Sequence, residues 1–300
     1  MRSIRKYVDL LESKSESTKS NSERIEKLKK WLKNKKYSEY VKSLDKMLED
    51  PKAKVLLQDG FGGELGDIDF DFEVKLLPAK SLMPTQSEID VKKSLEHALT
   101  NPKNIKDAFN SEEIVVNDSP IVTFRGNYVI DGHHRWSEIA MVNPEGLMMC
   151  YDYDAPISPI QMLKAVQGAI AAVIADDKDA ELPKSEAKSQ NIYDNEWDAK
   201  KVEKYINKTI TDDVVAELCK YYEKCNEKKD VVKIIVDNIM TMKVDNPPIH
   251  NSQERDIMPQ PDKAGTDRKD KETSKKTSKP DDKGSALSKM KDGKFEKDVL

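Results

Sequence analysis

Cysteine is scarce in this sequence. The 300-residue chain has three cysteines, Cys150, Cys219 and Cys225, an odd number without a Cys-x-x-Cys pair. This count supports neither a disulfide framework nor a zinc site, and it favours a reducing cytoplasm as the compartment. Long apolar runs are missing as well: no stretch of about 18 apolar residues occurs, so no membrane span is expected. The N-terminus also lacks the apolar core of a signal peptide.

A strong charge of one sign is also absent. The formal net charge is −4, because 51 basic residues nearly balance 55 acidic ones. The chain therefore has no global attraction to nucleic acid, and only a local basic patch stays open as a DNA contact. The basic run Lys29–Lys36, which contains Trp31, is one such patch. The alternative is that this run is the solvated face of a helix, since acidic residues flank it.

The polar composition predicts unfolded stretches beside folded ones, because 35% of the residues are charged and only 37% are hydrophobic. Periodicity and composition divide the chain into a short helix (1–12), a linker (13–22), a helical N-terminal segment (23–69), a mixed α+β domain (70–156), a helical C-terminal segment (157–245) and a disordered tail (246–300). The short helix and the tail are candidate docking segments for a protein partner. Helices are expected at 193–204, 211–228 and 229–244.

The mixed domain opens with a predicted strand at 73–77 and a turn at Pro84. Ser87 is expected to cap a helix that continues to Leu99, which places Glu88 and Asp90 in its first turn. Further strands are expected at 114–116, 120–124, 128–130 and 147–151. A hairpin turn at 125–127 is expected to join the strands 120–124 and 128–130.

The stretch 127–142, NYVIDGHHRWSEIAMV, carries the chemistry. It predicts a short buried strand, a tight turn at Asp131-Gly132 and a helix. The first turn of a helix has N–H groups outside the helical ladder and the positive end of the dipole, so this junction suits an anion. Arg135 supplies a guanidinium fork for phosphate, and His133 and His134 supply donors or a proton shuttle.

The DGHHRW motif after an apolar strand, preceded by PIVTFRGNYVI, resembles the ParB/sulfiredoxin superfamily, most closely its serine-kinase-like and phage-encoded branches. LLPAKSLMPTQSEID (76–90) is similar to the opening strand and turn of that family, and the resemblance covers roughly residues 70–155. It implies an α+β fold, a small mixed sheet with helices, flanked by helical segments and the disordered tail. It also implies that the turn binds nucleotide phosphates.

By this resemblance the catalytic candidates are Glu88, Asp131, His133 and His134, and the phosphate-binding candidates are Gly132, His133, His134 and Arg135. Glu88 would act on a substrate hydroxyl, and Asp131 would hold Mg²⁺ or orient the hydroxyl. The expected ligand is a nucleoside di- or triphosphate with Mg²⁺, for phosphoryl transfer or nucleotide hydrolysis. Two other readings stay open: a DNA-binding, nuclease or partition-type module of a phage or mobile element, and a non-catalytic phage accessory or structural protein found in host cytoplasm or virion.

Simpler roles compete with this chemistry. Asp131 could cap the helix, and Arg135 could pair with Asp131 or Glu138. A zinc site is rejected, because adjacent histidines on a helix point about 100° apart and no Cys pair completes the set. Sulfiredoxin chemistry is not expected, since His133 stands where that family has its cysteine.

Overall fold

A five-stranded mixed sheet underlies the molecule. The computed structural model describes residue 48 and residues 68–109, 121–166 and 190–253. The strands β1 (Asp71–Pro78), β2 (Met83–Pro84), β3 (Ile121–Phe124), β4 (Tyr128–Asp131) and β5 (Leu147–Asp154) lie in the order β1-β5-β3-β4-β2. The pairs β1–β5 and β3–β4 are antiparallel, and the pairs β3–β5 and β2–β4 are parallel. The predicted α+β class is confirmed.

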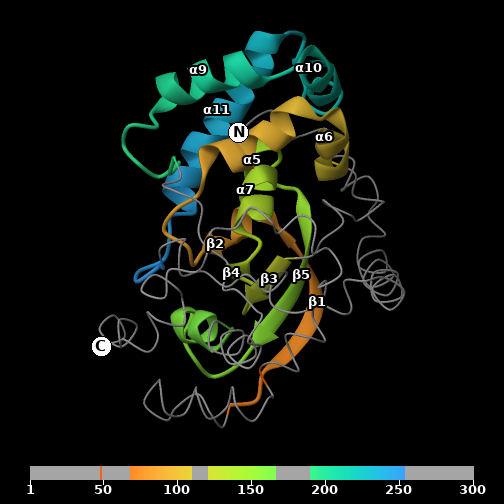
Figure 1. Cartoon of the computed structure of the whole chain (residues 1–300). Coiled ribbons are helices and arrows are strands. Elements are labelled where there is room, and N and C mark those ends of the chain that lie inside the picture. The colour runs from red at the N-terminus through yellow and green to blue at the C-terminus, as the bar shows by residue number, and fades with distance from the viewer. Residues whose placement is uncertain (1–47, 49–67, 110–120, 167–189, 254–300) are drawn as a thin grey trace, which may run out of the picture.

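Apart from the helix that begins at Pro159, the described helices gather at one end of the sheet (Figure 1). They are a 3-10 turn, η1 (Ala79–Ser81), and the α-helices α5 (Val91–Thr100), α6 (Pro102–Phe109), α7 (His133–Val142), α9 (Ala199–Thr209), α10 (Asp212–Leu218) and α11 (Lys228–Asp245). A further helix starts at Pro159, and Ser158 caps it by accepting from the Gln161 amide at 3.2 Å.

Helix α7, which carries the motif, is the centre of the fold. Eight of its ten residues are buried, and α5 and α11 pack directly against it. Trp136 is fully buried and its indole N–H donates to the Ala79 carbonyl at 2.8 Å. One hydrophobic core joins strand residues such as Cys150 to α11 residues such as Ile235. Helices α9, α10 and α11 of the C-terminal segment therefore complete the core of the mixed domain.

The β3–β4 hairpin forms where the sequence predicts it. Arg125 and Gly126 both have positive φ, 50° and 68°, and the Asn127 amide donates to the Phe124 carbonyl at 3.2 Å. Two central residues with positive φ define a type I′ turn, which matches the twist of the flanking strands. This tight turn sends β4 directly back along β3 towards the motif.

The start of α5 differs from the prediction. The helix begins at Val91, and Asp90 is its N-cap, accepting from the Lys93 amide at 2.9 Å. Ser87 does not cap the helix: it lies three residues before the Asp90 N-cap, and its amide and hydroxyl both donate to the distant Gln253 carbonyl, at 2.9 and 3.2 Å. Glu88 therefore lies in an extended segment before the helix and not in its first turn.

The predicted boundary of the tail at 246 is also wrong. Residues 246–253 form a strap along β2: the Ile249 amide donates to the Pro84 carbonyl at 3.1 Å, and the Gln253 amide donates to the Thr85 carbonyl at 2.8 Å. The buried Asn246 side chain holds the start of the strap through the Lys80 and Leu82 carbonyls, at 2.7 and 3.0 Å. These long-range bonds hold a polar segment that composition alone does not mark as folded.

The expectation about cysteines needs the same kind of correction, because Cys219 and Cys225 form a disulfide. Helix α10 starts near the predicted position, after its Thr211 cap, but ends at Leu218 instead of continuing to 228. The chain then turns back and brings the two Cα atoms to 4.8 Å. Helix α9 likewise starts at Ala199, after the Asp198 cap, and not at Tyr193. Cys150 is a buried free thiol.

Several predicted features lie outside the described residues. These are the helix at 1–12, the linker at 13–22, nearly all of the segment 23–69 with its basic run, the strand at 114–116 and the tail beyond 253. Within the part of the chain that the structure describes, no helix combines the length and apolar character needed to cross a membrane.

Candidate functional site

Gly132 makes the sharp turn between β4 and α7. Its φ of +93° lies in the left-handed region, which L side chains rarely adopt. A Cβ at this position would also come within 2.5 Å of Ile121 Cγ2 and 3.0 Å of Arg135 Nη2. The first helical bond runs from the Trp136 amide to the Gly132 carbonyl at 2.9 Å, so the amides of residues 133–135 precede the helical ladder. The turn therefore brings backbone donors and a guanidinium to one place.

Arg135 folds back over this turn towards Asp131. Its Nη2 atom lies 3.4 Å from Asp131 Oδ2, and the two side chains are 29% and 23% exposed. The ion pair is long, and partial exposure weakens it further. The guanidinium thus stands at the positive end of a buried helix, where an anion gains from both the dipole and the charge.

His133 lies in the interior, 4% exposed. The Thr85 amide donates to its Nε2 atom at 3.2 Å, and because an amide can only donate, Nε2 must carry a lone pair and the ring proton must sit on Nδ1. Burial, together with the nearby His134 and Arg135 charges, lowers the pKa of His133 to about 3, against a hydrogen bond to the Val129 backbone that raises it. In this environment His133 stays neutral and holds β2 against the turn. A role for His133 in proton transfer is not favoured.

His134 faces a different environment, half-buried at the junction of α7 and α5. Its Nδ1 atom lies 3.4 Å from the Ser94 hydroxyl of α5. Ser94 in turn lies 2.7 Å from the Ser137 hydroxyl, and Ser137 donates to the His134 carbonyl at 3.1 Å. Both serines are fully buried. The two histidines are neighbours in the sequence, but they differ in burial and in the residues that they contact.

Glu88 belongs to a segment that three distant parts of the chain hold in place. Asn191 brackets it, because its side chain accepts from the Ile89 amide at 3.0 Å and donates to the Ser87 carbonyl at 3.3 Å. The strap binds the same segment at Ser87, and Thr85 binds His133. Glu88 itself is half-buried. The structure thus fixes the backbone of Glu88 on a segment that contacts the motif helix through Thr85.

Thr85, Ser94 and Asn191 are the residues that the sequence prediction missed. Each contacts the motif, or the Glu88 segment, across 40 or more residues of the chain: the separations are 48 for Thr85–His133, 40 for Ser94–His134 and 102 for Asn191–Ile89. Only the Pro84-Thr85 turn had a local signal. No local pattern in the sequence marks the other two.

Among the described residues, no group of three or more His, Cys, Asp or Glu side chains is placed to hold a metal ion. Asp131 is the one predicted metal ligand. Mg²⁺ commonly uses one or two carboxylates together with substrate phosphates. A single carboxylate beside a phosphate site, such as Asp131, fits Mg²⁺ that is held mainly by the phosphates of a bound nucleotide.

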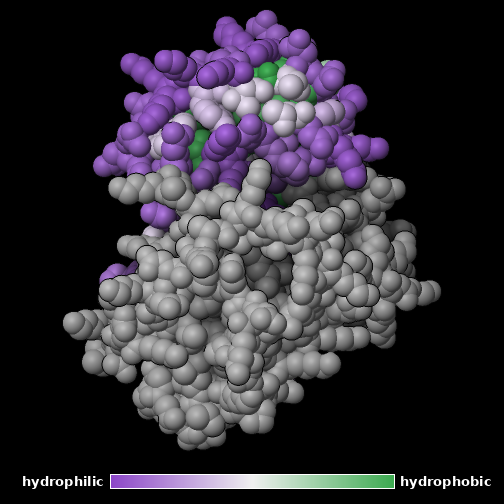
Figure 2. Space-filling model, in the orientation of Figure 1, coloured by the Kyte–Doolittle hydropathy of each residue, from purple (hydrophilic) through white to green (hydrophobic). Residues whose placement is uncertain are grey.

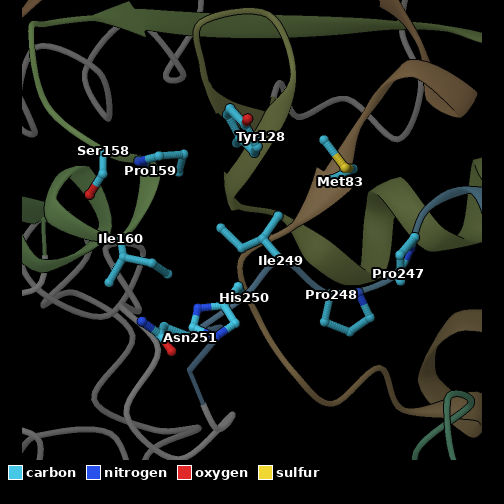
Figure 3. A pocket seen from close by; sticks show the side chains of 10 residues that line it. All are labelled: Met83, Tyr128, Ser158, Pro159, Ile160, Pro247, Pro248, Ile249, His250 and Asn251. Atoms are coloured by element: carbon cyan, nitrogen blue, oxygen red, sulfur yellow. The ribbon is translucent and has the colours of Figure 1, made fainter. Parts of the chain in front are cut away.

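A cavity of about 530 Å³ lies away from this turn, at the other end of β4 (Figure 3). Tyr128 and Met83 line it from the strand starts, Ile160 from the helix that begins at Pro159, and Ile249 and His250 from the strap. None of the predicted site residues lines it. The cavity and the motif turn therefore lie at opposite ends of β4.

Helices α9, α10 and α11 with their connections (199–245), here called the helical cap, present a hydrophilic surface with a few apolar residues (Figure 2). Charges on its exposed positions from 199 to 245 are balanced, with seven basic and seven acidic side chains: Lys200, Lys204, Lys208, Lys220, Lys224, Lys229 and Lys233 against Glu203, Asp212, Asp213, Glu223, Glu227, Asp237 and Asp245. DNA-binding surfaces concentrate basic residues on one face. Summed over these exposed positions, the helices carry no excess of positive charge.

Comparison with known proteins adds no family to this geometry: no family model matches the chain, and neither a curated protein nor a solved structure is detectably similar to it. The resemblance to the ParB/sulfiredoxin superfamily stays a prediction that rests on the DGHHR motif and its flanking strands.

Proposed function

We propose that the Asp131–Arg135 turn binds the phosphate groups of a nucleotide. The observation that carries this proposal is the position of Arg135: its Nη2 atom would lie 3.0 Å from a Cβ built on Gly132, above the amides that open a buried helix. Backbone N–H groups, a helix dipole and a guanidinium fork are the three elements with which proteins hold phosphate oxygens. His134 adds a fourth group at the same helix start.

The proposal extends to phosphoryl transfer or nucleotide hydrolysis of the ParB/sulfiredoxin type. Phosphoryl transfer requires mainly positioning and charge neutralisation. Arg135 and the turn amides would neutralise charge, Asp131 would hold Mg²⁺, and Glu88 would accept the proton of the attacking hydroxyl or water. When bound, Mg²⁺ supplies additional positive charge to the phosphates. The fixed backbone around Glu88 supports this role, because a catalytic base must be held in a defined place.

Titration calorimetry with ATP, ADP and CTP in the presence of Mg²⁺ tests the binding step. We expect wild-type protein to bind at least one nucleotide and Arg135→Ala to lose tenfold or more in affinity, about 1.4 kcal/mol or more. Arg125→Ala is the matched control, since Arg125 is also a partly exposed arginine in a carboxylate pair, with Asp154 at 3.1 Å, but lies at the opposite end of β4.

The outcomes separate cleanly. Equal losses in the two arginine variants would point to a general charge effect, and absence of binding in wild type would refute the proposed site. If nucleotide binds, Glu88→Gln should lower turnover at least tenfold while leaving the nucleotide Kd unchanged. Full turnover in that variant would remove Glu88 from the chemistry. The balanced charge of the helical cap gives no comparable support for a DNA-binding function.

A further inference from the structure

The connection between α10 and α11 carries the disulfide, and its two cysteines differ in exposure. Cys219 is the C-cap of α10 and is partly exposed, whereas Cys225 is only 8% exposed and belongs to the hydrophobic core. A thiolate breaks a disulfide by attacking one of its two sulfur atoms, and access helps to decide which sulfur it reaches. The burial of Cys225 therefore directs an incoming thiolate to Cys219.

We propose that Cys219 is a site of reversible S-thiolation by a small thiol of the glutathione class. The attacking thiolate forms a bond to Cys219 Sγ, the bond between the two protein sulfurs breaks, and its electron pair leaves with Cys225 Sγ, which takes a proton from water. A second small thiolate then attacks the sulfur of the first, releases Cys219 as a thiolate and forms the oxidised small disulfide. That disulfide drives the reverse sequence, so the same mixed disulfide at Cys219 forms in both directions.

This exchange changes a loop that reaches the motif helix. Tyr222 lies between the two cysteines, and its hydroxyl donates to the Val142 carbonyl at the end of α7. Asn238 of α11, outside the loop, donates to the preceding carbonyl of α7 at 3.0 Å. The mixed disulfide removes the cross-link that restrains Tyr222. The last turn of α7 should therefore loosen, while Asn238 keeps the helix attached to α11.

The first test locates the reactive sulfur with two variants that each keep one member of the pair. Cys225→Ser keeps the Cys219 thiol, and Cys219→Ser keeps the Cys225 thiol. With oxidised glutathione as the probe, mass spectrometry of digested samples follows the adduct at each residue. We expect the folded protein to react at least tenfold faster at Cys219 than at Cys225, and the two rates to become equal in urea. Faster or equal reaction of Cys225 in the folded state overturns the proposal.

Cys150 is the internal control in both variants, because it is a buried free thiol. It should stay unmodified while Cys219 reacts. If the Cys219 adduct forms only as fast as the Cys150 adduct, unfolding exposes both residues and the proposal is wrong. In wild type, brief treatment with reduced glutathione followed by N-ethylmaleimide should give glutathione on Cys219 and maleimide on Cys225. The opposite assignment would equally overturn it.

The consequence for α7 is read from amide hydrogen exchange of the wild type before and after treatment with reduced glutathione. The Asn143 amide closes the end of α7 by donating to the Ile139 carbonyl, and the Ile210 amide closes α9 in the same way by donating to Ile206. We expect the Asn143 amide to exchange at least threefold faster after treatment and the Ile210 amide to change little. Equal acceleration at both amides would reveal a general loss of stability and overturn the coupling to α7, as would an unchanged Asn143 amide.

Tyr222→Phe tests the hydroxyl as the link, because it keeps the ring and removes the donor to α7. Its Asn143 amide should exchange fast while the disulfide is intact, and glutathione should add little. A full acceleration by glutathione in this variant would overturn the role of the hydroxyl. No readout here uses a nucleotide, so S-thiolation and the phosphate site are tested separately.

Discussion

At the scale of single residues, Gly132 has no room for a side chain. Gly132→Ala places a side chain at φ +93° and a Cβ 2.5 Å from Ile121 Cγ2. Left-handed backbone costs an L residue about 1–2 kcal/mol and overpacking costs roughly 1–3 kcal/mol more. Urea denaturation should therefore show a loss of about 2–5 kcal/mol. Gly126→Ala is the control, because φ is +68° there but the nearest atom is Asp152 Oδ2 at 3.9 Å. Equal losses at the two glycines would contradict the close packing at the motif.

His133 predicts a specific dependence of stability on pH. The unfolded chain binds a proton at this histidine near the ordinary pKa of about 6.5, whereas burial lowers the pKa in the folded protein to about 3. The unfolded state therefore binds more protons between these values. Stability is unaffected above pH 6.5 and falls as the pH drops towards 3.

The matched variant for this test is His133→Gln, whose side-chain oxygen can still accept from the Thr85 amide. At pH 5, relative to pH 8, wild type should lose about 2 kcal/mol more unfolding free energy than His133→Gln. Denaturant titrations at both pH values measure the difference. Identical pH profiles would show that His133 is not buried in its neutral form.

At the scale of elements, the strap 246–253 is held by hydrogen bonds to β2 and by Asn246. The Asn246→Ala substitution leaves the buried Lys80 and Leu82 carbonyls without this donor, which costs about 1–3 kcal/mol. We expect faster hydrogen exchange at the Ile249 and Gln253 amides. Asn207→Ala, on the exposed face of α9, is the control. Unchanged exchange in the strap would show that Asn246 does not hold it.

The elements also show how far the sequence could predict this fold. The hairpin at 125–127, the turn at Gly132 and the strands beside it were predicted because their causes are local: backbone φ preferences and apolar alternation. The start of α5 was not, because the Gln253 carbonyl, 166 residues away, holds Ser87 outside the helix through both its amide and its hydroxyl. The site divides in the same way. The residues of the motif could be identified from their side-chain chemistry. The different environments of His133 and His134 could not, because they arise from Thr85 and Ser94, which only folding brings close to them.

At the scale of the whole molecule, the Cys219–Cys225 disulfide closes a loop that adds to the contact between α11 and the motif helix. Within this loop the Tyr221 ring stacks on Phe109 of α6, with centroids 4.4 Å apart. The Tyr222 hydroxyl donates to the Val142 carbonyl at the end of α7. The cap therefore holds the C-terminal end of the helix whose N-terminal end forms the candidate site.

Reduction of this disulfide should weaken the whole core. For a cross-link between residues separated by six positions, the chain-entropy model gives about 2 kcal/mol of stabilisation. A reducing agent should lower the unfolding free energy of wild type by roughly that amount. The double variant Cys219→Ser/Cys225→Ser should start at the lower value and be insensitive to the reductant, whereas Cys150→Ser should keep the wild-type response. Because the loop joins α10 and α11 to α6 and α7, the transition should remain single and cooperative. A separate early transition of residues 199–245 would show instead that the cap unfolds independently of the sheet and the motif helix.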